Sequence, residues 1–191
     1  MEIERREFFM AIQSQDLGMV QAVLELGVDV DTINDNGYAP LHIAVDKKNE
    51  KLVEVLLAFR ANIDITDRHL VHEQTPLGLT PLHRAATIWG PGAKQLLEYG
   101  ANPNVQDVRG RTPLHCAILA YEWPRPPGGV VQWLLSFGAN PHKKDTCGRS
   151  PWSMLLELLG LFPDLEVRQH LIEVLLAHES VSRPFTTISF E

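Results

Sequence analysis

The chain has 191 residues, 45% of them hydrophobic, so it is long enough and apolar enough to bury the core of a folded domain. Its 17 Lys and Arg against 24 Asp and Glu give a net charge of −7, which argues against binding to nucleic-acid phosphates. No apolar stretch reaches the roughly 20 residues of a membrane span, and the acidic N-terminus differs from a secretory signal. Cys116 and Cys147 show no metal-like spacing. We therefore expect an intracellular protein that binds neither nucleic acid nor membrane.

The most informative feature of the sequence is internal repetition. A nine-residue segment recurs as GYAPLHIAV (37–45), GLTPLHRAA (78–86), GRTPLHCAI (110–118) and, in a more divergent form, GRSPWSMLL (148–156). A second signature alternates with it as LELGVDVD (24–31), LAFRANID (57–64), LEYGANPN (97–104) and LSFGANPH (135–142). The T-P-L-H-x-A box, the leucines and the Gly-Ala-Asn ending resemble the motifs of ankyrin repeats, over nearly the whole chain.

The resemblance implies an all-α repeat fold, an ankyrin-repeat solenoid of helix-turn-helix units with β-hairpin finger loops. We expect one domain, 1–191, whose first and last units are atypical caps. The units in chain order are 1–33 (N-terminal cap), 34–66, 67–106, 107–144, and 145–191 (C-terminal cap and tail). Unit three carries an insertion at 68–75, which lengthens its finger loop. Unit four carries one at 121–129, between its helices, where prolines prevent a continuous helix.

Helix starts and turns follow from the repeated box. Thr precedes Pro in Thr80-Pro81 and Thr112-Pro113; its hydroxyl can accept from free backbone amides, and Pro fits the first helical position. Ala39 replaces this Thr in unit two, so we expect a helix start weaker by about 1 kcal/mol. The glycines that open each box, Gly37, Gly78, Gly110 and Gly148, are expected at turns that need a positive φ angle.

The histidines divide into two groups. His42, His83 and His115 share one motif position, and the resemblance implies that they link one unit's loop to the next by hydrogen bonds. His69 and His72 lie in the finger insertion next to Glu73, a spacing compatible with a metal ligand pair. Because two ligands do not close a site, we predict no metal. No catalytic motif or cofactor-binding motif is present, so we predict neither catalytic residues nor a cofactor.

Charge and exposed apolar residues indicate a binding surface for another protein. The fingers change from acidic at 28–36 to basic at 142–149, which would orient a partner if the charges are not simply those of solvated loops. We predict contacts on the concave face and fingers, with Tyr38, Leu79, Ile88, Trp89 and Leu119 exposed there. The candidate partner-binding residues are Asp35, Tyr38, Asp46, His69, His72, Leu79, Ile88, Trp89, Arg109, Arg111, Leu119, Lys144 and Arg149.

The resulting prediction is a non-catalytic protein-protein interaction module, an adaptor that grips one macromolecular partner. One alternative is an enzyme or small-ligand-binding protein that uses the groove, with the inserted histidines as its polar group. Another is a scaffold spacer with an inert finger surface. The resemblance also implies Asn104 and Asp64 as acceptors for asparaginyl-type hydroxylation. The sequence assigns no oligomeric state.

Overall fold

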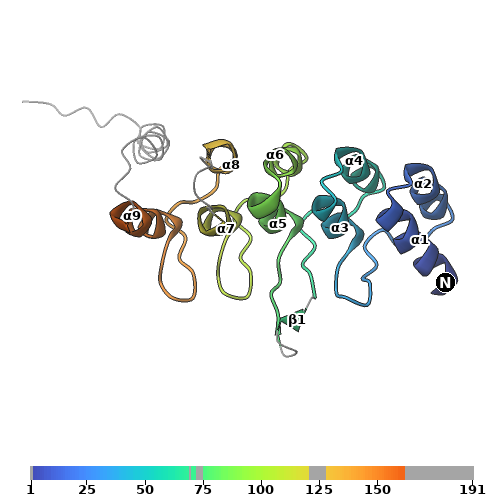
Figure 1. Ribbon diagram of the computed structural model, residues 1–191, viewed down its shortest axis with the longest axis horizontal. Helices are drawn as coiled ribbons and strands as arrows, with labels where there is room; N and C mark the ends of the chain where they lie inside the picture. The colour runs from blue at the N-terminus through green and yellow to red at the C-terminus, as the bar shows by residue number, and fades with distance from the viewer. Residues whose placement is uncertain (1, 69, 72–74, 121–127, 162–191) are drawn as a thin grey trace, which may run out of the picture.

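The computed structural model describes residues 2–68, 70–71, 75–120 and 128–161. Its helices are α1 (Glu2–Ser14), α2 (Leu17–Glu25), α3 (Pro40–Asp46), α4 (Glu50–Ala58), α5 (Pro81–Ile88), α6 (Gly90–Glu98), α7 (Pro113–Leu119), α8 (Gly128–Ser136) and α9 (Pro151–Leu161). The odd-numbered helices form one row and the even-numbered helices a second row, with the finger loops projecting from the first (Figure 1). The described part of the chain is therefore an all-α repeat solenoid.

The helices begin where the sequence provides caps. The side chain of Asp16 accepts from the amide of Met19 at the start of α2, and Asn49 accepts from Leu52 at the start of α4. In α5, Thr80 and His83 form a reciprocal pair: the Thr80 amide donates to His83 Nδ1 at 3.2 Å, and the Thr80 hydroxyl lies 2.8 Å from it. Thr112 and His115 repeat this pair in α7, whereas Ala39 provides no side-chain cap for α3, as expected.

The core lies between the two rows of helices. The leucines of the second helices, Leu52, Leu56, Leu96 and Leu134, are fully buried. Ala44 and Ala85 are also fully buried and stand on first helices that pack against each other, where their small side chains allow close approach. Since each unit covers its neighbour, stability accumulates through these contacts between adjacent units.

The fingers share one closed frame of hydrogen bonds. Two residues, the first and the last of the frame, close each finger. The backbone amide of the first residue donates to the carbonyl of the last residue, and the side chain of the first residue accepts from the backbone amide of the last residue. The frame pairs are Asn34 with Tyr38, Asp67 with Leu79, Asp107 with Arg111 and Asp145 with Arg149. The glycine before each last residue has a positive φ angle, as predicted.

Each finger is numbered by its unit, so the third finger is the one that Asp67 and Leu79 close. It has the same frame, although these two residues are much farther apart in sequence than the other pairs. Asp67 still donates to the Leu79 carbonyl at 2.9 Å and accepts from its amide at 3.0 Å. Within the intervening segment, β1 (Leu70–Val71) pairs antiparallel with β2 (Thr75–Pro76). Among the described fingers, paired strands occur only here, because the others have too few residues between their frame partners.

Three histidines connect consecutive units. Nε2 of His42 lies 2.8 Å from the carbonyl oxygen of Leu79, Nε2 of His83 lies 2.9 Å from that of Arg111, and Nε2 of His115 lies 3.1 Å from that of Arg149. Because threonine amides donate to Nδ1 of His83 and His115, the proton of these neutral rings sits on Nε2, which donates. The predicted structural role of the repeated histidine is confirmed.

The His42 ring differs from the other two. Its Nδ1 atom is buried without a hydrogen-bond partner, and residue 39 is an alanine, which has no hydroxyl to offer. Burial lowers the pKa of His42 to about 4, and burial also lowers the pKa of His83 and of His115. All three rings therefore favour the neutral form in the folded chain.

Candidate interaction surface

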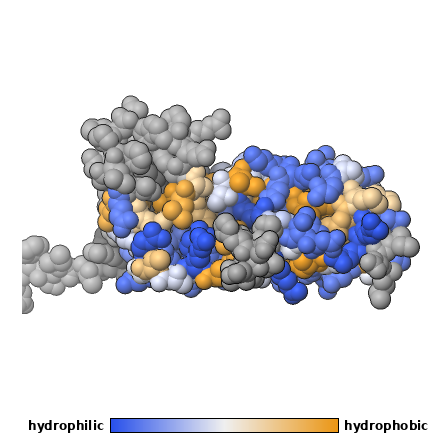
Figure 2. Space-filling model, turned by 60° about the horizontal axis from the view of Figure 1, so that its bottom comes forward, coloured by the Kyte–Doolittle hydropathy of each residue, from blue (hydrophilic) through white to orange (hydrophobic). Residues whose placement is uncertain are grey.

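We call the surface made by the finger loops and the exposed sides of α3, α5, α7 and α9 the finger face. Equivalent positions of the four repeated boxes form rows across it. One row is Tyr38, Leu79, Arg111 and Arg149; the next is Ile43, Arg84, Cys116 and Met154, of which only Arg84 is not buried; the third is Asp46, Thr87, Leu119 and Glu157. In the view of Figure 2, which brings this side forward, polar and apolar residues alternate over the coloured surface. The side chains that a partner would meet thus change from unit to unit.

Arg84 joins units two and three on this face. Its guanidinium makes two hydrogen bonds to the Asp46 carboxylate, through Nε at 2.9 Å and through a terminal nitrogen at 2.5 Å. It also lies over the Tyr38 ring, 4.7 Å from the centroid, and 4.0 Å from a carboxylate oxygen of buried Asp67. Ion pairing and the ring quadrupole both favour the cation, so Tyr38 and Asp46 serve as inter-unit contacts.

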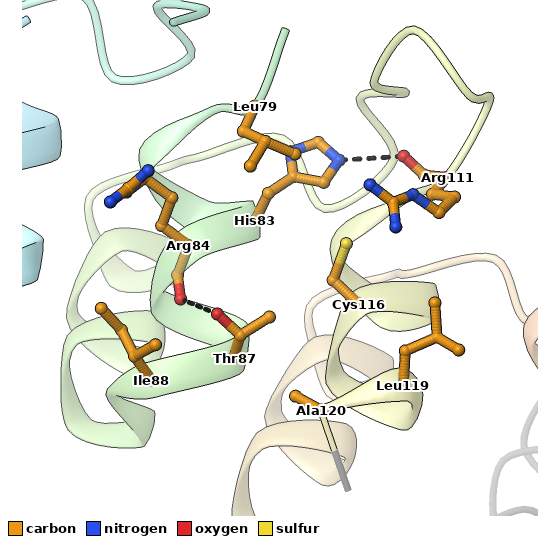
Figure 3. A pocket seen from close by; sticks show the side chains of 9 residues that line it. All are labelled: Leu79, His83, Arg84, Thr87, Ile88, Arg111, Cys116, Leu119 and Ala120. Atoms are coloured by element: carbon orange, nitrogen blue, oxygen red, sulfur yellow. Dashed lines mark hydrogen bonds between the residues drawn. The ribbon is translucent and has the colours of Figure 1, made fainter. Parts of the chain in front are cut away.

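A groove of about 390 Å³ lies between α5 and α7 (Figure 3). Ile88 and Leu119 are its exposed apolar side chains, at 43% and 49% exposure. Leu79 and Arg111 line it at the finger end. The remaining lining residues are His83, Arg84, Thr87, Cys116 and Ala120. This depression with apolar walls and a cationic rim could hold one side chain of a bound segment.

The groove contains a thiol and an imidazole, yet neither is set up for nucleophilic chemistry. Burial raises the pKa of Cys116 to about 11, so the thiol stays protonated at neutral pH. Both ring nitrogens of His83 are engaged, Nδ1 with Thr80 and Nε2 with the Arg111 carbonyl. The imidazole is therefore not available as a general base for the thiol.

The basic residues of the last two fingers differ in their surroundings. Arg111 is largely buried and binds Asp107, with a terminal nitrogen 2.7 Å from the carboxylate. Arg149 pairs with Asp145 at 3.1 Å but remains 45% exposed. Arg109 and Lys144 are exposed. Only the last three of these cations are directly accessible to a partner.

Some predicted site residues lie apart from the groove. Asp35 is fully exposed and forms an ion pair of 3.3 Å with Arg5 of α1. His69 and His72 lie outside the described residues. Asp64 and Asn104 occupy the loops that follow the second helices of their units. The Asp64 carboxylate accepts from the backbone amide of Asn102, and the Asn104 side-chain oxygen accepts from the backbone amide of Asn140, each in the corresponding loop of the next unit. Asn104 also donates to the Gly138 carbonyl at 2.8 Å.

The expectation that Trp89 is exposed on this face is wrong. Trp89 lies between α5 and α6 and is only 8% exposed. Its ring occupies the space above Gly92, where an added Cβ would stand 1.9 Å from a ring carbon. A glycine three residues after the tryptophan is the sequence signal for this packing. Cys116 is buried, whereas Cys147 is exposed.

Arg84 is the residue that sequence reasoning missed. It occupies the variable position of the T-P-L-H-x-A box, where the other units have apolar residues that are buried. A single charged residue at an otherwise buried apolar position was the available signal. Such a residue must either reach solvent or find a partner, and Arg84 finds Asp46 and Tyr38.

Two negative findings apply to the described residues alone. No cluster of three or more His, Cys, Asp or Glu side chains there could hold a metal ion. None of the helices in that part of the chain is long and apolar enough to cross a membrane.

Comparison with known proteins agrees with the fold. The profile of ankyrin repeats (three copies) matches residues 7–69 and 67–145, so the chain belongs to the ankyrin repeat family. Ankyrin repeats generally mediate protein-protein interactions, and the family is generally non-catalytic.

Individual relatives match in part. Rabankyrin-5 of Mus musculus is 42% identical over 86 residues, covering 41% of this chain and 7% of the relative. The putative palmitoyltransferase ZDHHC13 of Danio rerio is 35% identical over 112 residues, covering 58% of this chain and 16% of the relative. Inversin of Homo sapiens is 32% identical over 144 residues, covering 59% of this chain and 13% of the relative. The matched regions thus span only a small part of each relative.

Proposed function

We propose that this chain is a non-catalytic adaptor that binds one protein partner through its finger face. The observation that carries the proposal is the groove between α5 and α7, where Ile88 and Leu119 leave apolar surface exposed next to polar rim residues. Interfaces commonly combine an apolar anchor site with a polar surround. The partner's anchor side chain would enter this groove and its flanking residues would contact the fingers.

The local chemistry supports binding over catalysis. The Cys116 thiol has a raised pKa, and the nitrogens of His83 are already bonded. Arg84 and Arg111 are held by Asp46 and Asp107, so their positions are set before any partner arrives. Side chains that are preorganised in this way lose little conformational entropy on binding.

The inserted third finger is the proposed specificity element, because it lengthens one loop of the finger face. Deleting 69–76 tests it with little damage to the scaffold. The deletion removes β1 and β2 but retains Arg68, whose amide donates to the Gly37 carbonyl at 2.7 Å. It also restores between Asp67 and Leu79 the sequence spacing of Asp107 and Arg111.

The experiment is capture of binding proteins from cell extract, identified by mass spectrometry, followed by titration of the purified partner. We expect the wild-type chain to recover a partner that the deletion variant loses or binds more weakly. Leu119→Glu, which places a charge in the groove, should also reduce affinity. Equal unfolding midpoints would show that both variants are folded. A partner that both variants bind as tightly as the wild-type chain would contradict a site on the finger face.

We also infer an intracellular location. Both cysteines are free thiols, which suits a reducing compartment. Microscopy of the tagged chain in its native cells tests this inference, and recovery from the culture medium would contradict it.

A further inference from the structure

The fourth finger (104–111) and the fifth finger (142–149) expose cations but no carboxylate. Their two aspartates, Asp107 and Asp145, are turned inward, at 6% and 7% exposure. Each carboxylate accepts backbone amides of its own finger as well as an arginine side chain. All residues of both fingers belong to the described part of the chain. The surface charge is therefore more positive than the sequence count suggests.

The two fingers also form one connected surface. The amide and the hydroxyl of Thr146 both donate to the Arg109 carbonyl, at 2.9 and 3.0 Å. The side chain of Gln106 donates to the Lys144 carbonyl at 3.0 Å. Arg109 and Lys144 thus project from loops that are bonded to each other, and exposed Arg149 closes the fifth finger. We call these three residues the cationic tip.

The cationic tip is adjacent to the groove. Arg111 ends the fourth finger and lines the groove, while Leu119 stands at the far end of α7 (Figure 3). From the Arg111 end the groove follows α7, which is about 10 Å long at its usual rise, so a segment that reaches Leu119 and also Arg109 and Lys144 is longer than the roughly three extended residues that cover α7 alone. One continuous segment of that length can therefore reach both features.

The opposite end of the finger face exposes a carboxylate, which pairs with Arg5. Asp35 of the second finger is fully exposed, and the chain as a whole has a net charge of −7. A local cationic tip on an acidic protein favours one orientation of a bound segment. Guanidinium groups also bind carboxylates with two parallel hydrogen bonds.

We propose that the partner presents an acidic segment, with carboxylates on the cationic tip and an apolar side chain of the same segment in the groove between α5 and α7. This inference rests on the proposed function and specifies the chemistry of the partner. The recognised element would be one short continuous segment that carries both acidic and apolar residues, rather than a folded surface assembled from distant parts of a partner.

The test is selection of displayed random-sequence peptides on the purified full chain, followed by synthesis of an enriched peptide and measurement of its affinity. We expect enriched peptides to carry Asp or Glu together with an apolar residue at a fixed spacing. Arg109→Glu with Lys144→Glu should weaken the synthetic peptide by tenfold or more, roughly the loss of one good ionic contact. Leu119→Glu should weaken it comparably.

The matched control is Lys48→Glu with Lys51→Glu, which changes the net charge equally at exposed positions outside the finger face. It should leave affinity unchanged. Replacing the peptide's acidic residues by their amides should weaken binding to the wild-type chain but not to the Arg109→Glu, Lys144→Glu variant.

Each contrary outcome has one meaning. Enriched peptides without acidic residues, or affinity that Arg109→Glu with Lys144→Glu does not change, would overturn the acidic segment while leaving a groove-binding adaptor intact. Retention of an RNA homopolymer by the wild-type chain, lost in the same variant, would assign the cationic tip to nucleic acid instead. Absence of both an enriched peptide and a captured protein would contradict the proposed function itself.

Discussion

A Cβ atom at Gly110 would stand 2.8 Å from the backbone nitrogen of Thr146 in the next finger. Gly148 has a similar positive φ angle, but nothing lies within 4 Å of the equivalent position. Both Gly→Ala changes impose the strain of a left-handed residue, about 1 kcal/mol. We expect Gly110→Ala to cost about 1–3 kcal/mol more than Gly148→Ala, because its new Cβ would collide with backbone atoms. Urea unfolding of both variants measures the difference, and equal losses would contradict the close approach of these fingers.

Ala39→Thr should stabilise the chain. The new hydroxyl would cap α3 and provide a partner for the buried Nδ1 of His42, as Thr112 does for His115. We expect a gain of about 1 kcal/mol in the free energy of unfolding. The reciprocal change, Thr112→Ala, should lose about 1 kcal/mol, because it removes the hydroxyl at the start of α7 while the backbone amide of residue 112 still donates to His115 Nδ1. Thermal or urea unfolding checks both, and a loss for Ala39→Thr would show that α3 has no room for the hydroxyl.

Stability should fall in mild acid. The folded-state pKa of His42 is about 4 and those of His83 and His115 are also lowered, so the unfolded chain binds more protons below the ordinary value of 6.5. The full contribution of the neutral rings is present above that value and is lost as the pH falls from 6.5 towards 4. The limiting slope is about 1.4 kcal/mol per pH unit for each histidine.

Urea unfolding at a series of pH values measures this slope. His42→Gln should reduce it, because one titrating ring is removed. A free energy of unfolding that stays constant across this pH range would contradict the histidine assignment.

Arg84→Met should destabilise the contact between units two and three by about 1–2 kcal/mol. It removes both the Asp46 ion pair and the contact with the Tyr38 ring. The comparison is Glu98→Gln, which breaks an exposed pair with Lys94 and should change stability by less than about 1 kcal/mol. A double-mutant cycle with Tyr38→Leu should give a coupling of about 0.5–2 kcal/mol. Zero coupling would show that the ring contact contributes no energy.

Hydroxylation at Asn104 or Asp64 stays a prediction, and intact mass measures it. The natively expressed protein should carry the mass of an added oxygen, which Asn104→Ala or Asp64→Ala would remove. An unmodified mass would contradict it. The Asn104 side chain bonds both Gly138 and Asn140, so a modified residue would sit within the contact between units three and four.

The repeated features of the fold could be predicted from sequence because each is set by local chemistry. Thr80-Pro81 starts a helix, Gly110 takes a left-handed turn, and His83 reaches the next loop, because the same box of residues recurs in units two, three and four. Departures from the repeat were harder to interpret. Trp89 looked exposed because its position follows a first helix, yet its burial depends on Gly92 lacking a side chain.

The candidate site could be predicted only in part for a related reason. Ile88 and Leu119 were identified as exposed apolar residues, since repeat phase alone places them on the finger face. The basic sign of the last finger followed from counting residues, but which of its charges are exposed required three-dimensional contacts. Counting residues gives Asp107 and Asp145 the same weight as Arg109 and Lys144, whereas the fold turns the two carboxylates inward.

The frame that Asp67 and Leu79 close has a consequence for how this protein can diversify. The same hydrogen bonds close the fingers whose frame residues are 4 apart in sequence and the third finger, where they are 12 apart, so the stacking of the helices does not depend on one length of this segment. Insertions, deletions or grafted recognition sequences at 69–76 can alter what the molecule binds without a matching loss of stability. The third finger is in this sense the most evolvable position of the scaffold and a natural graft point for engineering new specificity.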